Sequence, residues 1–351
     1  MSIIFQTFLT VLAFSAILSV LVVILAEKKN WFLNRHDLIG VQKFHCKPTP
    51  HVGGLAAFFS FFSGYWLLSA DVQSMLMPIL LLSALVFAIG LIEDFSSKIS
   101  PLWRLVFIFI SIGIGFFYLD IGVSSLGFVW ADNLLSYPII GLAFTLLVVG
   151  GAVNALNVID GYNGLMSGYA ILVSAAMAIV AYQLNDDLIV QLNLLLIASL
   201  LGFFLFNFPF GKLFMGDGGA YFVGFALSMI GLVFVDRHEV LSNWFVLLLL
   251  IYPMYELLFS IYRKRVVFGV PASQPDAHHL HMLIYKAIVS RNPKGSKTMS
   301  NSMTSPYLWA LSLVGVVPAM FWYDDKMMLI GWACIFMVVY TIVYRQISNL
   351  K

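Results

Sequence analysis

Apolar runs long enough to cross a lipid bilayer follow one another along almost the whole chain of 351 residues. A membrane-spanning helix needs about 20 apolar residues, and about 11 runs meet that requirement. Only 10% of the residues are charged, whereas soluble domains have about 25%. The pattern predicts an all-α polytopic membrane protein with helices over 3–26, 52–70, 75–92, 103–119, 135–153, 165–184, 187–206, 219–235, 243–262, 306–323 and 327–344.

The basic residues separate sharply when the loops are assigned to alternate sides of the membrane. Of the 19 Lys and Arg residues, all except Arg237 and Lys326 fall on one side. Cytoplasmic loops are enriched in Lys and Arg, so we expect the N-terminus outside and the C-terminus in the cytoplasm. The longer loops lie on the cytoplasmic side and are expected to form the active face of a single membrane domain over 1–351; they comprise 27–51, 93–102, 154–164, 207–218 and 263–305.

Two of these loops carry acids and amides next to an apolar run. Glu93 and Asp94 end the third run, where the helix dipole disfavours carboxylates; an ordinary solvated acid is the alternative. Asn154, Asn157 and Asp160 are spaced three apart and share one helical face if the helix continues. Polar groups at this depth need a partner, water or a ligand. Both a ligand site and a polar contact between helices explain them.

Two further loops carry groups suited to metal and phosphate. Asp217 precedes two glycines at a helix start, where it serves either as an N-cap or as a ligand of Mg²⁺, which prefers hard oxygen donors. His278, His279 and His281 follow a basic segment. Zinc is disfavoured because the chain has 2 cysteines and no second spaced pair of ligands. Anion binding is the better interpretation of the histidines.

At these positions the sequence resembles the polyprenyl-phosphate N-acetylhexosamine-1-phosphate transferase family. That family includes the enzymes that initiate O-antigen and teichoic acid synthesis, and the phospho-MurNAc-pentapeptide translocase. The resemblance covers nearly the whole chain. It rests on five ordered motifs, at 47–54 (KPTPHVGG), 90–94 (GLIED), 154–168 (NALNVIDGYNGLMSG), 214–219 (FMGDGG) and 279–281 (HLH).

The chain departs from the family pattern at four positions. Glu93 stands where the family has the first of two aspartates, and Asn163 where it has the second aspartate of Asp-Gly-x-Asp-Gly. Met282 replaces a further histidine, and Glu256 replaces an aspartate in the ninth run. These departures favour the branch that initiates surface polysaccharides over the pentapeptide translocase.

The resemblance implies a reaction and its participants. Undecaprenyl phosphate would attack the sugar-linked phosphorus of a UDP-N-acetylhexosamine, which releases UMP and gives a lipid-diphospho-sugar. Mg²⁺ is the expected cofactor, with Mn²⁺ as an alternative, and no nucleic acid is involved. The protein is expected as a multi-pass protein of the bacterial inner membrane with its active site on the cytoplasmic side. A homodimer is left open.

The resemblance also implies a role for each candidate residue. Asp94, Glu93 and Asp160 are the expected catalytic residues, and Asp217 and Asn163 the expected metal ligands. The expected substrate-binding residues are amides, cations and histidines on the same face: Lys47, Arg104, Asn154, Asn157, Asn207, Lys212, Arg263, Arg265, His279 and His281.

A lipid-linked-sugar transporter or flippase is the competing function. A transporter is expected to place ionisable residues near the middle of the bilayer and functional groups on both faces. Here the outer loops have few distinctive groups, and Glu256 is the main ionisable residue within a helix. The sequence therefore favours the enzyme.

Overall fold

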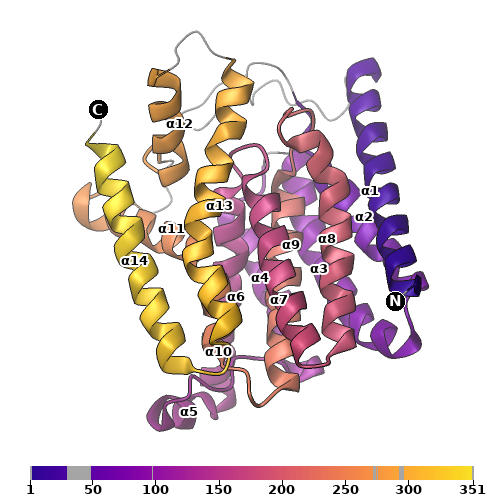
Figure 1. The fold of residues 1–351 in the computed structure, drawn as a ribbon, viewed down its shortest axis with the longest axis vertical. Coiled ribbons are helices and arrows are strands. Elements are labelled where there is room, and N and C mark those ends of the chain that lie inside the picture. The colour runs from indigo at the N-terminus through magenta and orange to yellow at the C-terminus, as the bar shows by residue number, and fades with distance from the viewer. Residues whose placement is uncertain are drawn as a thin grey trace.

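The structure, a computed structural model, describes residues 2–29, 49–96, 98–271, 274, 276–291 and 296–349. In this part of the chain every regular element is a helix, and the long helices stand side by side in one bundle (Figure 1). The elements are α1 (Ser2–Lys29), α2 (Gly53–Ser63), η2 (Gly64–Leu67), α3 (Ala70–Ser96), α4 (Pro101–Leu119), α5 (Val129–Leu135), α6 (Pro138–Ile159), α7 (Leu165–Gln183), α8 (Asp187–Asn207), α9 (Gly216–Arg237), α10 (Asn243–Leu249), α11 (Ile251–Tyr262), η3 (Arg263–Val267), α12 (Leu280–Arg291), α13 (Lys297–Phe321) and α14 (Lys326–Ser348).

The described helices confirm a polytopic membrane protein but do not confirm the count of 11 spans. Nine of them are long and apolar enough to cross a membrane, and α10 with α11 makes a tenth if the bent pair is one span. The run predicted over 52–70 forms an 11-residue helix, α2, followed by the short 3₁₀ helix η2.

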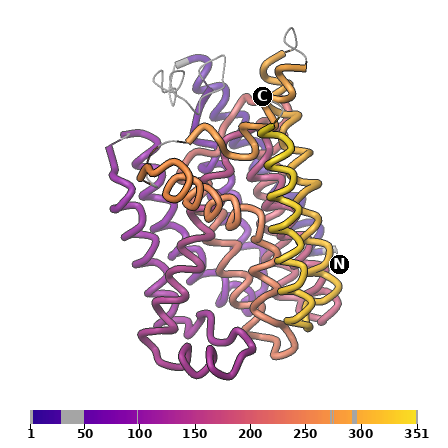
Figure 2. The backbone as a smooth tube through the Cα atoms, turned by 90° about the vertical axis from the view of Figure 1, so that its left-hand side faces the viewer, coloured from indigo at the N-terminus to yellow at the C-terminus, as the bar shows by residue number. Residues whose placement is uncertain are grey.

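The run predicted over 243–262 is broken rather than straight. Helices α10 and α11 meet at an angle of 71°, and Figure 2 shows α11 and η3 lying across the long helices. Pro253 is the third residue of α11, and a proline cannot donate the backbone hydrogen bond that a continuous helix needs there. The break turns the rest of α11 sideways.

Some predicted loops are helical. Helix α6 continues to Ile159, so Asn154 and Asn157 lie on a helix rather than in a loop over 154–164. The loop predicted over 263–305 contains η3, α12 and the first turns of α13. The Ser296 hydroxyl accepts a hydrogen bond from the backbone N–H of Met299, and this cap begins α13 before the predicted start of the span at 306.

Helix α9 forms the centre of the bundle, and its first turn packs against neighbours through glycines. In the most apolar stretch of this helix, 94% of the residues are buried inside the bundle. A Cβ atom at Gly90 would lie 2.5 Å from the Cα atom of Gly218, and one at Gly54 would lie 2.4 Å from that of Gly219. Helices α2 and α3 can therefore approach the start of α9 more closely than any larger residue would allow.

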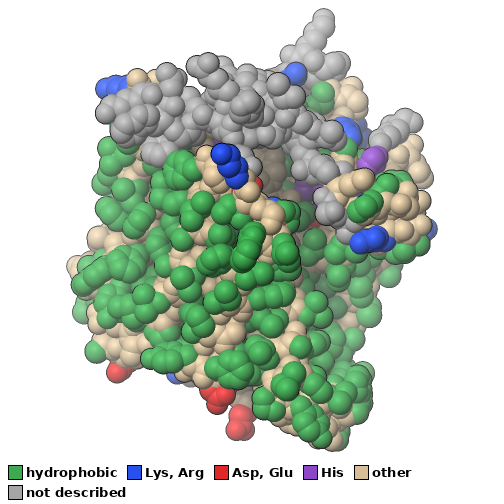
Figure 3. Space-filling model, turned by 180° about the vertical axis from the view of Figure 1, so that it is seen from behind, with side chains coloured by type: hydrophobic (Ala, Val, Ile, Leu, Met, Phe, Trp, Pro, Cys, Tyr) green, Lys and Arg blue, Asp and Glu red, His purple; other side chains and the backbone are tan. Residues whose placement is uncertain are grey.

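Charge is distributed unevenly along the bundle axis. Figure 3 shows apolar side chains over most of one face, with Lys and Arg near one end and Asp and Glu at the opposite end. In Figure 1 the N-terminus lies toward the lower end and the C-terminus at the upper end. This arrangement agrees with termini on opposite sides, and the assignment of the basic end to the cytoplasm stays a prediction.

Candidate active site

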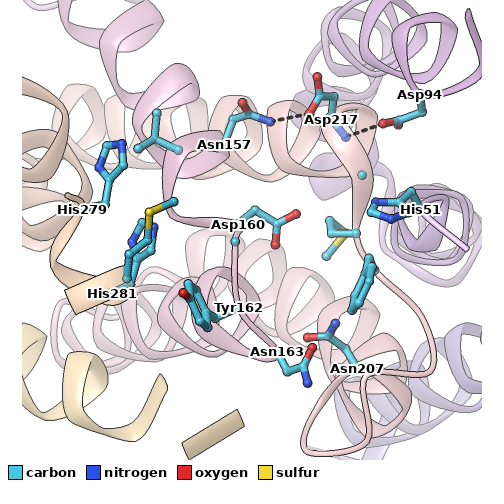
Figure 4. A pocket seen from close by; sticks show the side chains of 16 residues that line it. His51, Asp94, Asn157, Asp160, Tyr162, Asn163, Asn207, Asp217, His279 and His281 are labelled. Carbon is cyan, nitrogen blue, oxygen red and sulfur yellow. Dashed lines mark hydrogen bonds between the residues drawn. The ribbon is translucent and has the colours of Figure 1, made fainter. Parts of the chain in front are cut away.

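Three carboxylates from three helix ends face one cavity of about 380 Å³. Asp94 lies in the last turn of α3, Asp160 follows the last residue of α6, and Asp217 is the second residue of α9. Figure 4 shows His279 and His281 on the side of the cavity opposite Asp94 and Asp217. Other predicted residues that line this cavity are Asn157, Asn163 and Asn207. The predicted face therefore contains a pocket that is rich in oxygen donors.

The start of α9 holds the Asp94 carboxylate. Its two oxygens accept hydrogen bonds from the backbone N–H groups of Asp217 (2.8 Å) and Gly218 (3.0 Å). These N–H groups have no partner within the helix, and the helix dipole attracts a negative charge there. Gly216 has a φ of +80°, and a Cβ atom there would lie 2.7 Å from the Asp94 carboxylate. The first residue of α9 must therefore be glycine.

Asp217 is bound on both of its oxygens. Arg104 of α4 donates a 2.7 Å ion-pair hydrogen bond to one oxygen, and the Asn157 side-chain amide donates a 2.9 Å hydrogen bond to the other. The Asp217 side chain is 31% exposed, so the carboxylate is held in place but still open to the cavity. Arg104 therefore lies next to the predicted metal ligand, and the Asp217 carboxylate already neutralises part of the Arg104 charge.

Asp160 is the carboxylate with the least compensation. Its side chain points into the cavity between the other acids and the histidines (Figure 4), and it makes no hydrogen bond to the rest of the described chain. Burial, together with the negative charges of Asp217 and Asp94, raises the pKa of Asp160 well above its ordinary value. A cation or a proton in the cavity would relieve this repulsion.

Asn163 is held by α13 rather than by the acids. Its side-chain amide donates to the Ser302 hydroxyl (2.9 Å), its backbone N–H donates to Asn301 (2.8 Å), and the Ser305 hydroxyl donates to its carbonyl (2.6 Å). Figure 4 shows Asn163 across the cavity from Asp217. Its amide Oδ1 is buried without a hydrogen-bond partner in the described structure.

The histidines form the opposite wall of the cavity. The rings of His279 and His281 are stacked, with centroids 5.2 Å apart and an interplanar angle of 6°. The His281 ring also packs against Tyr162, with centroids 5.3 Å apart. Burial, and then the charge of His279, lower the pKa of His281 to about 3. His281 is therefore neutral at physiological pH.

Comparison with known protein families gives a match over 76–235 to the family described as Glycosyl transferase family 4. Over this stretch the chain is similar to that family. It contains all three cavity carboxylates, whereas His279 and His281 lie beyond its end.

Curated relatives are similar over a longer part of the chain. The chain is 29% identical over 248 residues to a Bacillus subtilis protein named "Probable undecaprenyl-phosphate N-acetylglucosaminyl 1-phosphate transferase", a match that covers 68% of this chain and 66% of that protein. It is 26% identical over 330 residues to the undecaprenyl-phosphate alpha-N-acetylglucosaminyl 1-phosphate transferase of Thermotoga maritima, covering 92% of this chain and 94% of that protein.

A third relative represents the translocase branch. The phospho-N-acetylmuramoyl-pentapeptide-transferase of Lactobacillus gasseri is 34% identical over 145 residues, which is 40% of this chain and 43% of that protein. The family resemblance predicted from the motifs is confirmed. The chain spans just under two thirds of the length of the Bacillus relative, at 66%.

Six predicted residues lie in the described structure but do not line the cavity: Glu93, Arg104, Asn154, Lys212, Arg263 and Arg265. Glu93 accepts a 2.7 Å hydrogen bond from the backbone N–H of Ile99 and so closes the turn after α3. Asn154 donates to the carbonyl of Gly150 (2.7 Å) in its own helix. Lys212 is exposed, and its ammonium lies 5.6 Å from the centre of the Phe210 ring.

The two predicted arginines of η3 differ from each other. Arg263 is buried, 4% exposed, and donates to the carboxylate of Asp276. Its guanidinium therefore holds the loop before α12 rather than facing the cavity. This ion pair lowers the pKa of Asp276, although burial alone would raise it. Arg265 is exposed. Lys47 lies outside the described residues.

Two cavity residues with a ring and a polar atom, His51 and Tyr162, were missing from the predicted site. His51 lies just before α2 and packs its ring against Phe214, with centroids 4.9 Å apart. Tyr162 lies in the turn between α6 and α7, and both line the cavity. His51 falls inside the 47–54 motif, which was the available signal. Tyr162 lies between Asp160 and Asn163 and carried no separate signal.

The cavity fits Mg²⁺ bound through few protein ligands. Within the described residues, no group of three or more His, Cys, Asp or Glu side chains is arranged to hold a metal by itself. Mg²⁺, however, is commonly held by one or two carboxylates together with substrate phosphates. The uncompensated Asp160, the open face of Asp217 and the unpartnered Oδ1 of Asn163 are hard oxygen donors of the right kind.

Proposed function

We propose that the protein transfers an N-acetylhexosamine-1-phosphate from a UDP-sugar to a polyprenyl phosphate. The single observation that supports this proposal best is the meeting of Asp94, Asp160 and Asp217 at one cavity at the end of the bundle. The Bacillus and Thermotoga relatives carry names that describe this transfer for N-acetylglucosamine. Because the polar groups gather at helix ends rather than along a path through the bundle, the arrangement favours a transferase over a transporter.

In the proposed reaction an oxygen of the polyprenyl phosphate attacks the sugar-linked phosphorus of the donor. A new phosphorus–oxygen bond forms, the bond between that phosphorus and the bridging oxygen breaks, and UMP leaves with the bonding electrons. Asp94 would orient the lipid phosphate or take its remaining proton. Its carboxylate is already fixed by two backbone N–H groups, and such positioning is the main contribution that phosphoryl transfer requires from a protein.

Asp217 and Asp160 are the carboxylates that would hold Mg²⁺, with the Oδ1 atom of Asn163 as the available amide oxygen. When bound, the metal supplies positive charge for the donor diphosphate. Arg104 and Asn157 keep the Asp217 carboxylate in one orientation through bonds of 2.7 and 2.9 Å. Glu93 would act only on the turn that ends α3, because it binds the N–H of Ile99.

The cations and histidines at this end of the bundle would bind the phosphate oxygens that the metal does not neutralise. His279 lines the cavity and would donate to a donor phosphate. The hydrophobic tail of undecaprenyl phosphate would stay in the bilayer beside the bundle, and the UDP-sugar would enter from the cytoplasm. The product would start a surface polysaccharide, such as an O-antigen, at the bacterial inner membrane. The homodimer stays a prediction.

The test is UMP release by the purified protein in detergent. The reactions contain undecaprenyl phosphate, one UDP-N-acetyl sugar at a time, and either Mg²⁺ or EDTA. UMP that requires the lipid, the metal and one particular sugar supports the proposal and identifies the donor. Folded protein that releases no UMP from any donor, beside an active relative such as the Thermotoga protein, contradicts it.

A further inference from the structure

A fully buried acid lies behind the histidine wall of the cavity. Glu256 of α11 is 0% exposed, and it is not among the residues that line the cavity. Burying a carboxylate costs several kcal/mol unless cations and hydrogen-bond donors compensate it. A residue that only filled space in α11 would be apolar, so Glu256 needs a reason to be there.

Three donors from outside α11 surround the Glu256 carboxylate: one in α14, one at the start of α12 and one just before α12. The His279 ring nitrogen Nδ1 lies 2.8 Å from Oε1, the backbone N–H of Leu280 donates to the same oxygen at 3.3 Å, and the Tyr340 hydroxyl donates to Oε2 at 2.6 Å. With both oxygens engaged, the carboxylate has one orientation. It fixes the histidine from the side facing away from the cavity.

This arrangement determines which nitrogen His279 presents to a ligand. A carboxylate accepts but does not donate, so the proton between the two residues belongs to Nδ1 of His279. The other ring nitrogen, Nε2, is then the atom that can meet a ligand in the cavity. A histidine held in this way has a defined ring orientation, and its Nε2 donates only when that nitrogen also carries a proton.

The other buried acid nearby, Asp276, already has its own partners, so Glu256 is the carboxylate that pairs with His279. The buried cation Arg263 already donates to Asp276, and the His278 backbone N–H donates to that same acid at 2.9 Å. The His279 ring also stacks on the His281 ring, with centroids 5.2 Å apart. Stacking fixes the plane of the His279 ring, and the bond to Glu256 fixes its rotation within that plane.

We propose that Glu256 and Tyr340 are positioning residues, which hold His279 so that Nε2 faces a phosphate of the nucleotide-sugar donor and donates to it when the ring carries a proton on both nitrogens. This inference rests on the proposed function for the identity of the ligand. Neither residue touches the substrate. A rival role is purely structural, with Glu256 serving only to join α11, α12 and α14.

The test compares Glu256→Gln and Tyr340→Phe with the wild-type protein. Gln keeps an oxygen that accepts from Nδ1 but lacks the charge, and Phe removes only the hydroxyl that fixes Oε2. Tyr255→Phe is the matched control, because Tyr255 neighbours Glu256 on α11 but its hydroxyl bonds to Thr341 at 3.0 Å. Thermal unfolding of each variant shows whether it remains folded.

Two measurements distinguish positioning from a structural role. In steady-state kinetics, Glu256→Gln is expected to raise KM for the UDP-sugar about 10- to 100-fold, with a smaller change in KM for the lipid. Tyr340→Phe is expected to shift the same parameter by less, and Tyr255→Phe to leave it unchanged. Equal loss of kcat for all three variants without a change in KM would overturn the proposal.

The second measurement does not depend on activity. In protein labelled with ¹⁵N-histidine, the signals of His279 are identified by their absence from His279→Gln. We expect Nδ1 to carry a proton in the wild type and in Tyr255→Phe, and to share it with Nε2 in Glu256→Gln. If His279 has the same protonation pattern in Glu256→Gln as in the wild type, the proposal fails. If Nδ1 of His279 carries a proton in the wild-type protein but this protein releases no UMP, the result contradicts the proposed function alone.

Discussion

The carboxylate of Asp94, at the end of α3, accepts a 2.8 Å hydrogen bond from the backbone N–H of Asp217, in the first turn of α9. Residues 123 positions apart in the chain are thereby joined at the cavity. The same bond caps α9, so Asp94 has a structural role as well as the proposed catalytic one. Variants at this position must be tested for both.

Asp94→Asn is expected to lower the rate of UMP release about 10²- to 10⁴-fold, the usual range for a group that positions or accepts a proton. The amide can still accept one backbone hydrogen bond, so the protein should remain folded. Glu93→Gln is the matched control, because the neighbouring acid binds Ile99 rather than the cavity. Equal losses in both variants would contradict the separate roles assigned to the two acids.

The Mg²⁺ requirement should depend on Asp217 and Asp160. Asp217→Asn and Asp160→Asn are each expected to raise the Mg²⁺ concentration for half-maximal activity about 10- to 100-fold. Asp236→Asn, at an exposed position at the end of α9 away from the cavity, should leave it unchanged. Titration of Mg²⁺ into EDTA-treated protein measures this concentration. An unchanged metal requirement in both cavity variants would exclude these carboxylates as ligands.

Stability in EDTA should depend on the ionisation of Asp160. Its pKa is raised above the ordinary value of 3.8, so the folded state holds a proton that the unfolded state releases. The free energy of unfolding therefore falls as the pH rises from the pKa of Asp160 in the unfolded state toward its higher pKa in the folded state. Asp160→Asn cannot ionise, so its melting temperature relative to the wild type should be higher at pH 8 than at pH 4. A pH-independent difference would show that Asp160 is not perturbed by its neighbours.

Close packing at the first turn of α9 should be sensitive to a single methyl group. In Gly90→Ala the new Cβ atom would lie 2.5 Å from the backbone of Gly218, and overpacking of this kind costs about 1–3 kcal/mol. Gly113→Ala in α4 is the control, since a Cβ atom there has no neighbour within 4 Å. Thermal unfolding should show a lower melting temperature for the first variant only, and equal values would refute the close approach.

The helical bundle could be predicted because hydrophobic runs and basic loops are local properties of the sequence. The exact bounds of the helices could not be predicted. Asn154 and Asn157 seemed to end a helix because they are polar, yet α6 continues to Ile159, and Asn157 instead binds Asp217. The bend between α10 and α11 was readable in principle from Pro253, but an unbroken apolar run masks such a position.

The site residues could be grouped on one face but not paired. Motifs placed Asp94, Asp160 and Asp217 together, and they do share a cavity. Nothing in the sequence could show that Arg104 pairs with Asp217 rather than with a substrate, because the two lie 113 positions apart. Pairing depends on how helices pack, and that arrangement is fixed by many weak contacts at once.

Transfer of the phosphosugar as one unit is the central claim, and a doubly labelled donor tests it most directly. The donor is a UDP-N-acetyl sugar that the protein uses, with ³²P in the sugar-linked phosphate and ³H in the sugar. After incubation with undecaprenyl phosphate and Mg²⁺, the lipid is extracted and both labels are counted. We predict that the two labels enter the lipid in equal amounts and that UMP is the released nucleotide. Lipid that contains ³H without ³²P, with UDP released, would contradict the account, because the sugar alone would then have moved.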